Sequence, residues 1–345
     1  GELAGSYCLT EPGAGSDANS GKSKATLSDD GKHFILNGQK MWITNGGFAD
    51  VYIVFAKIDD DRKLSFFIVD KGTPGLSVGE EEKKLGIKGS STVQVYLEDC
   101  KIPSDNMLGK REEGFKIALN ILNAGRIKLA SSANGASKST LEHALRYASE
   151  RKQFGAHLTS FQVIQHKIAE MAQRTFTSDT ATLACGDDIE RFEKDLLRNS
   201  NVNDFASKRD ALEEYAVECA LLKVIGSEAL DHVIDEGLQI YGGMGYSAEA
   251  PMERAYRDAR ITRIYEGTNE INRMAGAGMA IQNIQKNFLR TLATICREKA
   301  VATLTFPKRA LSSAVTTANI SGFRAMTLLL AVICMLVYKK GIKTQ

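Results

Sequence analysis

Short apolar runs, several of them alternating with polar residues, recur from residue 1 to about residue 108 of the 345-residue chain. They cover residues 33–36, 51–55, 64–69 and 93–97, and Gly, Asp, Asn and Pro residues separate them. Alternation with a period of two, interrupted by turn-forming residues, is typical of half-buried β-strands. We therefore expect residues 1–110 to form a small β-barrel or β-sandwich domain.

The hydrophobic period changes near Glu113. From Phe115 to about Gln285 apolar residues fall three and four positions apart, as at Ile117 and Ile121. This spacing predicts amphipathic helices several turns long, enough for an antiparallel four-helix-type bundle over residues 111–285. The polar stretch 186–210 mixes acidic and basic residues, and we expect it to be a solvated excursion between helices. The predicted fold class is α+β.

Residues 286–345 form a third, divergent segment. Residues 325–338 are almost entirely apolar, and two lysines follow them. Fourteen residues are fewer than the roughly 20 that a membrane-spanning helix needs. We expect a buried or interfacial helix here, and peripheral membrane contact through this tail is the open alternative.

Charge and cysteine content exclude some classes of partner. The chain has 44 basic and 42 acidic residues, a net charge of +2, without a concentrated basic stripe. Nucleic acid is therefore not an expected partner. Six cysteines are scattered without a CxxC pair or a histidine at metal-binding spacing, so we expect free thiols and no metal site.

The first residues suggest a portion of a longer protein. The sequence opens Gly-Glu-Leu-Ala without methionine and reaches a glycine-rich motif within about a dozen residues. We expect a preceding segment to be missing, so the sequence indicates no compartment.

The glycine-rich motif at residues 13–18 formally matches the GxGxxA dinucleotide fingerprint. That fingerprint follows a buried strand and opens a helix, whereas Glu11-Pro12 precedes this motif and a poor helix former follows it. An NAD site is not expected. A turn that offers backbone N–H groups and a hydroxyl to an anionic ligand fits better.

Two further positions carry alternatives that residue patterns leave open. Trp42, the only tryptophan, stands at the end of a predicted strand beside Thr44. It is either an aromatic packed at a rim or one face of a planar cofactor's site. Arg151 ends a predicted helix just before Gly155, as an ordinary C-terminal cation or as a phosphate-binding residue.

The last two motifs lie further along the chain. Gly242 and Gly243 follow an apolar helix, where glycines commonly mark a helix end. Glu266 is a carboxylate in an apolar context, followed at once by Gly267. A solvated surface glutamate is the ordinary interpretation. In an apolar cleft the pKa of Glu266 would rise toward working pH, as a general base requires.

Taken in order, these motifs resemble the acyl-CoA dehydrogenase family. The resemblance runs from Gly1 to about Arg273, through residues 7–17, 42–44, 151–155, 239–243 and 265–268. Gly125 stands where some relatives carry their catalytic base, which places the likeness nearest the very-long-chain branch. The family has an N-terminal helical domain, which we expect to be missing here, then a middle β domain and a C-terminal bundle.

The resemblance implies an FAD cofactor and an acyl-CoA ligand. Residues implied at the flavin ring are Thr10, Ser16, Trp42, Ile43 and Thr44, and those near its phosphates are Thr268 and Glu270. Those implied to hold a neighbouring subunit's FAD, in a homodimer or homotetramer, are Arg151, Gln153, Phe154, Gln239, Gly242 and Gly243. Those implied at the acyl-CoA are Ser16, Asn123, Arg126 and Gly267.

The implied chemistry is α,β-dehydrogenation of a long-chain fatty acyl-CoA to a trans-2-enoyl-CoA in β-oxidation. Glu266 would remove the α proton while the flavin accepts the β hydrogen as hydride. Electrons would pass to an electron-transfer flavoprotein. The compartment would be cytoplasmic in a bacterium and mitochondrial in a eukaryote. Two alternatives stay open: an acyl-CoA oxidase, and a non-catalytic interaction or assembly protein of the same fold.

Overall fold

The computed structural model describes residues 1–200 and 202–285. The chain divides into a compact unit, Gly1–Ala280, and a second unit, Ile281–Gln345. The predicted tail, 286–345, with its apolar stretch and any membrane contact, lies outside the described residues.

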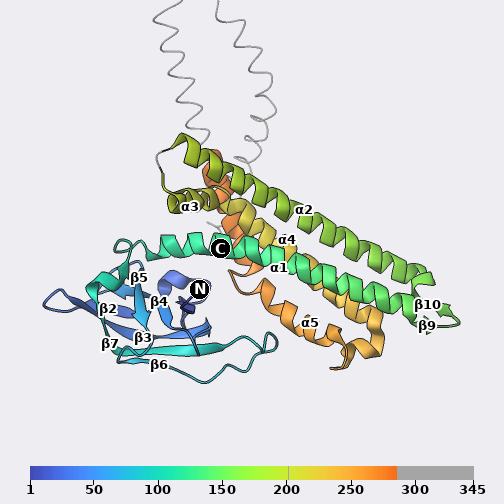
Figure 1. Ribbon diagram of the computed structural model, residues 1–345, viewed down its shortest axis with the longest axis horizontal. Helices are drawn as coiled ribbons and strands as arrows, with labels where there is room; N and C mark the ends of the chain where they lie inside the picture. Colours follow the sequence, from blue (N-terminus) through green and yellow to red (C-terminus); the bar gives the residue numbers. More distant parts are fainter. Residues whose placement is uncertain (201, 286–345) are drawn as a thin grey trace, which may run out of the picture. The chain divides into compact units, whose positions relative to one another are not determined.

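Eight strands form one mixed sheet in the first part of the compact unit (Figure 1). Along the sheet the order is β6-β7-β3-β2-β4-β5-β8, and β1 pairs in parallel with β4. The strand bounds are β1 Gly5–Cys8, β2 Lys24–Leu27, β3 His33–Thr44, β4 Val51–Ile58, β5 Ser65–Asp70, β6 Leu76–Val78, β7 Thr92–Pro103 and β8 Met107–Leu108.

The predicted apolar runs lie in the strands that build the sheet's core. Alternate residues of β3, β4 and β7 are buried, among them Leu36, Val54 and Val95. Long β3 and β7 pair antiparallel from His33 opposite Pro103 to Thr44 opposite Thr92. Their register shifts between Lys40 and Ile43, just where Trp42 lies. The pairing of β3 with β7 is therefore irregular at Trp42, and it resumes at Ile43 and Thr44.

The second part is helical, which confirms the α+β prediction. Its helices are α1 Gly114–Glu150, α2 Gln162–Asn199, α3 Asp204–Glu214, α4 Ala216–Tyr241 and α5 Pro251–Ala259, and residues 269–285 are also helical. The long helices α1, α2 and α4 lie side by side (Figure 1). A short hairpin of β9 (Lys152–Gln153) and β10 (Ala156–His157) links α1 to α2.

Small residues let α1 and α4 approach closely. A Cβ atom added at Gly226 of α4 would lie 3.1 Å from the Cα atom of Ala130 on α1. Because that neighbour is backbone, it cannot rotate away, so a side chain at Gly226 would force α1 and α4 slightly apart.

Polar contacts join the sheet to the bundle within the compact unit. The amide of Ile87 donates to an Asp258 carboxylate oxygen at 2.6 Å, and Arg257 donates to the Leu85 carbonyl at 3.0 Å. At the start of α1, the Gly114 amide donates to the Leu64 carbonyl at 2.8 Å. The strands and helices are thus tied at both the α1 and the α5 ends.

The expectation for residues 186–210 is wrong over most of its length, because α2 continues through Gly186 to Asn199. Ion pairs on the helix surface, Lys194 with Glu190 and Arg191 with Asp188, accompany this charged extension. Charged side chains one helical turn apart favour an exposed helix as readily as a loop. Among the described residues, no helix is both long enough and apolar enough to cross a membrane.

Candidate active site

The glycine-rich turn lies beside the end of β3. The Met41 amide donates to the Thr10 carbonyl at 2.9 Å, and Glu11 and Ala14 exchange two backbone hydrogen bonds that close the turn. Ile43 is buried and Thr44 is exposed, while Trp42 has 51% of its surface exposed. The structure thus brings the predicted ring-side residues of two separate motifs together.

This surface fits a planar anionic cofactor. The indole of Trp42 offers an apolar face, and Thr44 follows two residues later. The hydrogen bond from the Met41 amide brings Thr10, the second hydroxyl-bearing residue, beside the same part of β3. Within the described residues, the amide N–H groups of Gly15 and Ser16 have no hydrogen-bond partner. Free amides in a turn are a common way to hold phosphate oxygens.

Glu266 lies in a loop between α5 and the helical residues that begin at 269. Its φ of 58° and the φ of 79° at Gly267 are both left-handed, so the chain reverses sharply here. The Glu266 carboxylate lies over Gly125 of α1, where an added Cβ atom would be 2.7 Å from Oε2. Gly125 therefore makes room for the carboxylate.

Three buried side chains hold the carbonyl groups of this base loop, residues 266–268. Arg126 donates to the Glu266 carbonyl at 3.3 Å, and Lys223 donates to the Gly267 carbonyl at 2.8 Å. Asn272 donates to all three carbonyls, at 3.2, 2.8 and 3.1 Å. The left-handed backbone is therefore fixed from the bundle side by donors on α1, α4 and the last helical segment.

The same surroundings set the charge of Glu266. Burial raises the pKa of Glu266, while Arg126 and Lys223 act in the opposite direction, and the net pKa stays raised. Burial lowers the pKa of Lys223 to about 8, with Arg126 adding to the effect. The Glu266 Oε2 atom is buried without a hydrogen-bond partner. An ionised carboxylate with a free lone pair and a raised pKa is suited to accept a proton.

The apolar surroundings of Glu266 come in part from the sheet. Tyr7 of β1 packs edge-to-face on Phe55, with ring centroids 5.0 Å apart. Burial, together with the nearby Glu266, raises the pKa of Tyr7. Within the described residues, the amide N–H of Glu266 has no partner, so it is free to donate to a ligand carbonyl.

Other predicted residues fall near the base loop as well. Asn123 is buried one turn before Arg126 on α1 and accepts from it at 3.1 Å. The Thr268 hydroxyl accepts from the Ile271 amide at 3.2 Å, which caps the helix that begins at residue 269. Glu270 is exposed in the first turn of that helix.

The remaining predicted residues lie at the other end of α1. About 26 residues of helix separate Gly125 from Arg151, which at ~1.5 Å per residue is about 39 Å. Arg151, Gln153 and Phe154 are exposed, and Phe154 has 96% of its surface accessible. The structure therefore does not bring this group to Glu266 of the same chain.

Gln239, Gly242 and Gly243 belong to this distant group. The C-terminal end of α4 reaches the end of α1, where the rings of Tyr147 and Tyr241 stack with centroids 4.1 Å apart. Gln239, Gly242 and Gly243 are exposed beside that stack. The predicted site residues thus lie in two separate places on one chain, around Glu266 and at the far end of α1. Such a separation is what binding a second subunit's cofactor would require.

Sequence reasoning missed Lys223, Asn272 and the Glu11–Lys40 pair. Lys223 and Lys40 are fully buried, although lysine ordinarily lies at the surface. The available signal was position: Lys223 is the one charged residue in the otherwise apolar stretch 219–225, and Lys40 lies two residues before Trp42.

Two family models match the chain. The acyl-CoA dehydrogenase middle domain covers residues 6–100, and the acyl-CoA dehydrogenase C-terminal domain covers residues 112–280. The helical bundle with its base loop and the β domain with its glycine-rich turn thus correspond to two successive domains of one enzyme family.

Individual relatives agree. A probable acyl-CoA dehydrogenase of Bacillus subtilis is 48% identical, over 79% of this chain and 46% of that protein. The short-chain specific acyl-CoA dehydrogenase of Megasphaera elsdenii is 40% identical, over 82% of this chain and 69% of that protein. The human mitochondrial very long-chain specific acyl-CoA dehydrogenase is 38% identical, over 79% of this chain and 40% of that protein. The chain therefore belongs to the acyl-CoA dehydrogenase family.

Solved structures give the same result. An acyl-CoA dehydrogenase of Bacillus anthracis complexed with FAD has a TM-score of 0.78 at 45% identity, covering 81% of this chain and 49% of that one. Butyryl-CoA dehydrogenase of Megasphaera elsdenii has a TM-score of 0.71 at 38% identity, covering 81% and 68%. A structure described as the electron transferring flavoprotein of Acidaminococcus fermentans has a TM-score of 0.70 at 37% identity, covering 80% of this chain and 68% of that one.

The chain spans about half the length of the Bacillus proteins that it matches. Relatives of short-chain and very-long-chain specificity match at similar identities, so the branch inferred from Gly125 stays a prediction.

Proposed function

We propose that the chain is the FAD-binding and base-bearing portion of an acyl-CoA dehydrogenase, with Glu266 as the catalytic base. The observation that carries this proposal is the position of the Glu266 carboxylate, which lies half-buried over Gly125. Its Oε2 atom has no hydrogen-bond partner, and burial raises its pKa. We also propose a β domain at 1–110 and a bundle at 111–285, a division supported by the ranges of the two family models.

Each residue's task follows from its position. The free amide of Glu266 donates to the thioester carbonyl oxygen, which stabilises negative charge developing there and so acidifies the neighbouring α carbon. The Glu266 carboxylate removes the α proton. Bound FAD would supply the acceptor for the β hydrogen, which would leave as a hydride. Trp42 and the hydroxyls of Thr10 and Thr44 orient the ring, and the Ser16 turn meets anionic groups of the cofactor and of CoA.

The wider context is also a proposal. The substrate is a fatty acyl-CoA, with long chains favoured on the strength of Gly125. Arg151, Gln153 and Phe154, about 39 Å along α1 from the base, hold the FAD of a second copy in a homodimer or homotetramer. The similar fold described as an electron transferring flavoprotein supports electron transfer to such a partner. Bacterial and mitochondrial relatives fit a cytoplasmic or mitochondrial site respectively.

The test compares the purified chain with its Glu266→Gln variant. Both are reconstituted with FAD, and the flavin absorption bands are followed during anaerobic addition of butyryl-CoA or palmitoyl-CoA. We expect bleaching in the unchanged chain and retained FAD without bleaching in Glu266→Gln. The acyl chain that bleaches faster identifies the length class.

Other outcomes separate the alternatives. Bleaching of equal rate in Glu266→Gln would remove Glu266 as the base. Hydrogen peroxide formed in step with substrate consumption, without an acceptor protein, would identify an oxidase. A chain that never takes up FAD but holds stable protein partners would favour the assembly role.

A further inference from the structure

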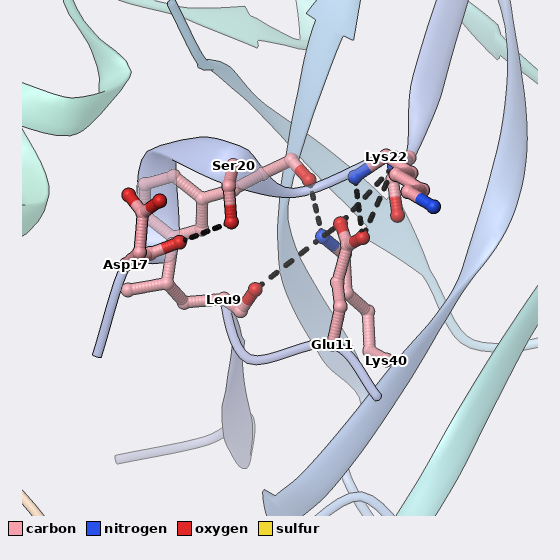
Figure 2. A network of polar contacts seen from close by, with 8 residues as sticks. Leu9, Glu11, Asp17, Ser20, Lys22 and Lys40 are labelled. Atoms are coloured by element: carbon pink, nitrogen blue, oxygen red, sulfur yellow. Dashed lines mark hydrogen bonds and ion pairs between the residues drawn. The ribbon is translucent and has the colours of Figure 1, made fainter. Parts of the chain in front are cut away.

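A buried ion pair links the glycine-rich turn to the sheet (Figure 2). The Lys40 ammonium lies 2.6 Å from Glu11 Oε1, with no exposed surface on Lys40 and 7% on Glu11. Lys40 also donates to the Phe55 carbonyl at 2.6 Å and to the Leu9 carbonyl at 3.5 Å. Its three ammonium protons thus have three acceptors, on the turn and on β4.

Glu11 extends the network in a second direction. Its carboxylate accepts from the amide of Lys22 at 2.6 Å and from the amide of Ser23 at 3.1 Å, and Figure 2 shows the Lys22 contact. An added Cβ atom at Gly21 would lie 2.9 Å from Glu11 Oε1, so glycine leaves the space that the carboxylate occupies. The pair therefore fixes both ends of the segment 11–22, which contains Ser16.

Lys40 is also placed to act on Trp42. It lies two residues before Trp42, at the start of the register shift in β3, and the Thr10 carbonyl bonds the intervening residue, Met41. Lys40 therefore belongs to the strand that carries Trp42, and its ammonium binds Glu11 in the turn that carries Ser16. The Thr10–Ser16 turn is one half of the cofactor-facing surface, and Trp42–Thr44 is the other.

Stability alone does not account for such a pair. Burial lowers the pKa of Lys40, and burial would also raise that of Glu11, but Lys40 and the hydrogen bonds hold the Glu11 pKa low. A buried ion pair of this kind carries a high desolvation penalty. Apolar residues of similar size often replace buried ion pairs without loss of stability.

We propose that Glu11 and Lys40 are positioning residues that set the spacing between the Thr10–Ser16 turn and Trp42, and thereby determine FAD affinity. The identity of the ligand as FAD rests on the proposed function. The positioning of the Thr10–Ser16 turn against Trp42 does not. Because Trp42 is the only tryptophan of the chain, its fluorescence reports this spacing without any cofactor.

The experiment compares Lys40→Met, Glu11→Gln and the double variant in the full 345-residue chain. Trp42 emission and acrylamide quenching are measured without FAD, FAD affinity is measured by titration, and the melting temperature is measured for each. Met171→Ala is the matched control, since Met171 is fully buried in the bundle.

Lys40→Met is expected to shift Trp42 emission and to weaken FAD binding at least about tenfold, because small misplacements of binding groups carry large penalties. The double variant removes the unpaired buried charge, so it should regain melting temperature without regaining FAD affinity. Met171→Ala should lower the melting temperature and leave Trp42 emission and FAD affinity unchanged.

Two results would overturn the proposal. One is a Lys40→Met chain that melts lower yet keeps the Trp42 emission and FAD affinity of the unchanged protein. The other is a double variant in which stability and FAD affinity recover together, which marks a purely structural pair. If Lys40→Met does not fold, the double variant and Glu11→Gln decide by the same criteria. Should the unchanged chain not bind FAD, the proposed function fails while Trp42 emission still tests the pair.

Discussion

Replacing Lys223 by methionine separates the function of the base loop from the stability of the bundle. Lys223 is fully buried and donates to the Gly267 carbonyl and to the Asn269 side-chain oxygen, each at 2.8 Å. Methionine has a similar length and removes both the donors and the positive charge near Glu266.

The stability change at pH 7 is the balance of two opposing effects. Two charge-assisted hydrogen bonds are lost, each worth about 1.5–3 kcal/mol. However, the Gly267 carbonyl keeps Asn272 and the Asn269 oxygen keeps Ser227 as donors. The lowered pKa of Lys223 shows that burial penalises the ammonium by more than its contacts return. We expect the free energy of unfolding to change by no more than about 1 kcal/mol.

The effect on the base is larger than the effect on stability. Lys223 opposes the rise in the Glu266 pKa, so its removal raises that pKa further. Arg126 remains beside the carboxyl and still opposes the rise, so only part of the opposing positive charge is lost. Only the ionised base accepts a proton, so the acid limb of the flavin-bleaching rate should move to higher pH.

The assays are urea unfolding across pH and the pH dependence of flavin bleaching. In the unchanged chain, the unfolded Lys223 binds its proton up to about pH 10.5 and the folded one only to about pH 8. Unfolding free energy from this group therefore rises with pH between those values, and Lys223→Met should lack the rise. Lys138→Met, at a surface pair with Asp179, is the control. Destabilisation by more than about 3 kcal/mol with an unmoved acid limb would refute this reasoning.

Three further outcomes are expected. Gly125→Ala should reduce the bleaching rate at least about tenfold with little change in melting, since its Cβ displaces the Glu266 carboxylate; an unchanged rate would contradict this. Gly226→Leu should destabilise by about 3 kcal/mol in urea unfolding through its clash with α1, whereas Gly135→Leu, facing open space, should not. Arg151→Ala should leave melting of the FAD-free chain unchanged, because Arg151 has no side-chain partner in the described structure, and should weaken FAD retention on gel filtration; FAD retained at full occupancy would argue against its role.

The sheet was the most predictable part of the fold. Residues such as Phe34, Val54 and Val95 are buried on one face, and their period of two records that environment directly. The change to a helical period near Glu113 agrees with the start of α1 at Gly114. Charge misled the prediction at residues 186–199, because an exposed helix and a loop both tolerate it.

The site was only partly accessible from sequence. Glu266 stood out through its motif, but the groups that fix it did not. Lys223 lies 43 positions earlier on α4, and only the folded bundle brings its ammonium to the Gly267 carbonyl. Lys40 and Glu11 pair across 29 positions. Contacts of that range leave no periodic trace along the chain, so no pattern of residue spacing predicts them.

Left-handed backbone at the proposed site residues lowers the stability of the fold, while their side chains serve the proposed function. Among the described residues, five left-handed positions are neither Gly nor Asn nor Asp, and three of them are Trp42, Phe154 and Glu266. Each such residue carries strain of about 1–3 kcal/mol that glycine would relieve. Selection or design for heat resistance alone would therefore drift toward glycine at the very positions whose side chains the proposed chemistry needs. Engineering for higher thermal stability should leave these three residues unchanged. Stabilising substitutions are better placed at exposed helical glycines such as Gly135.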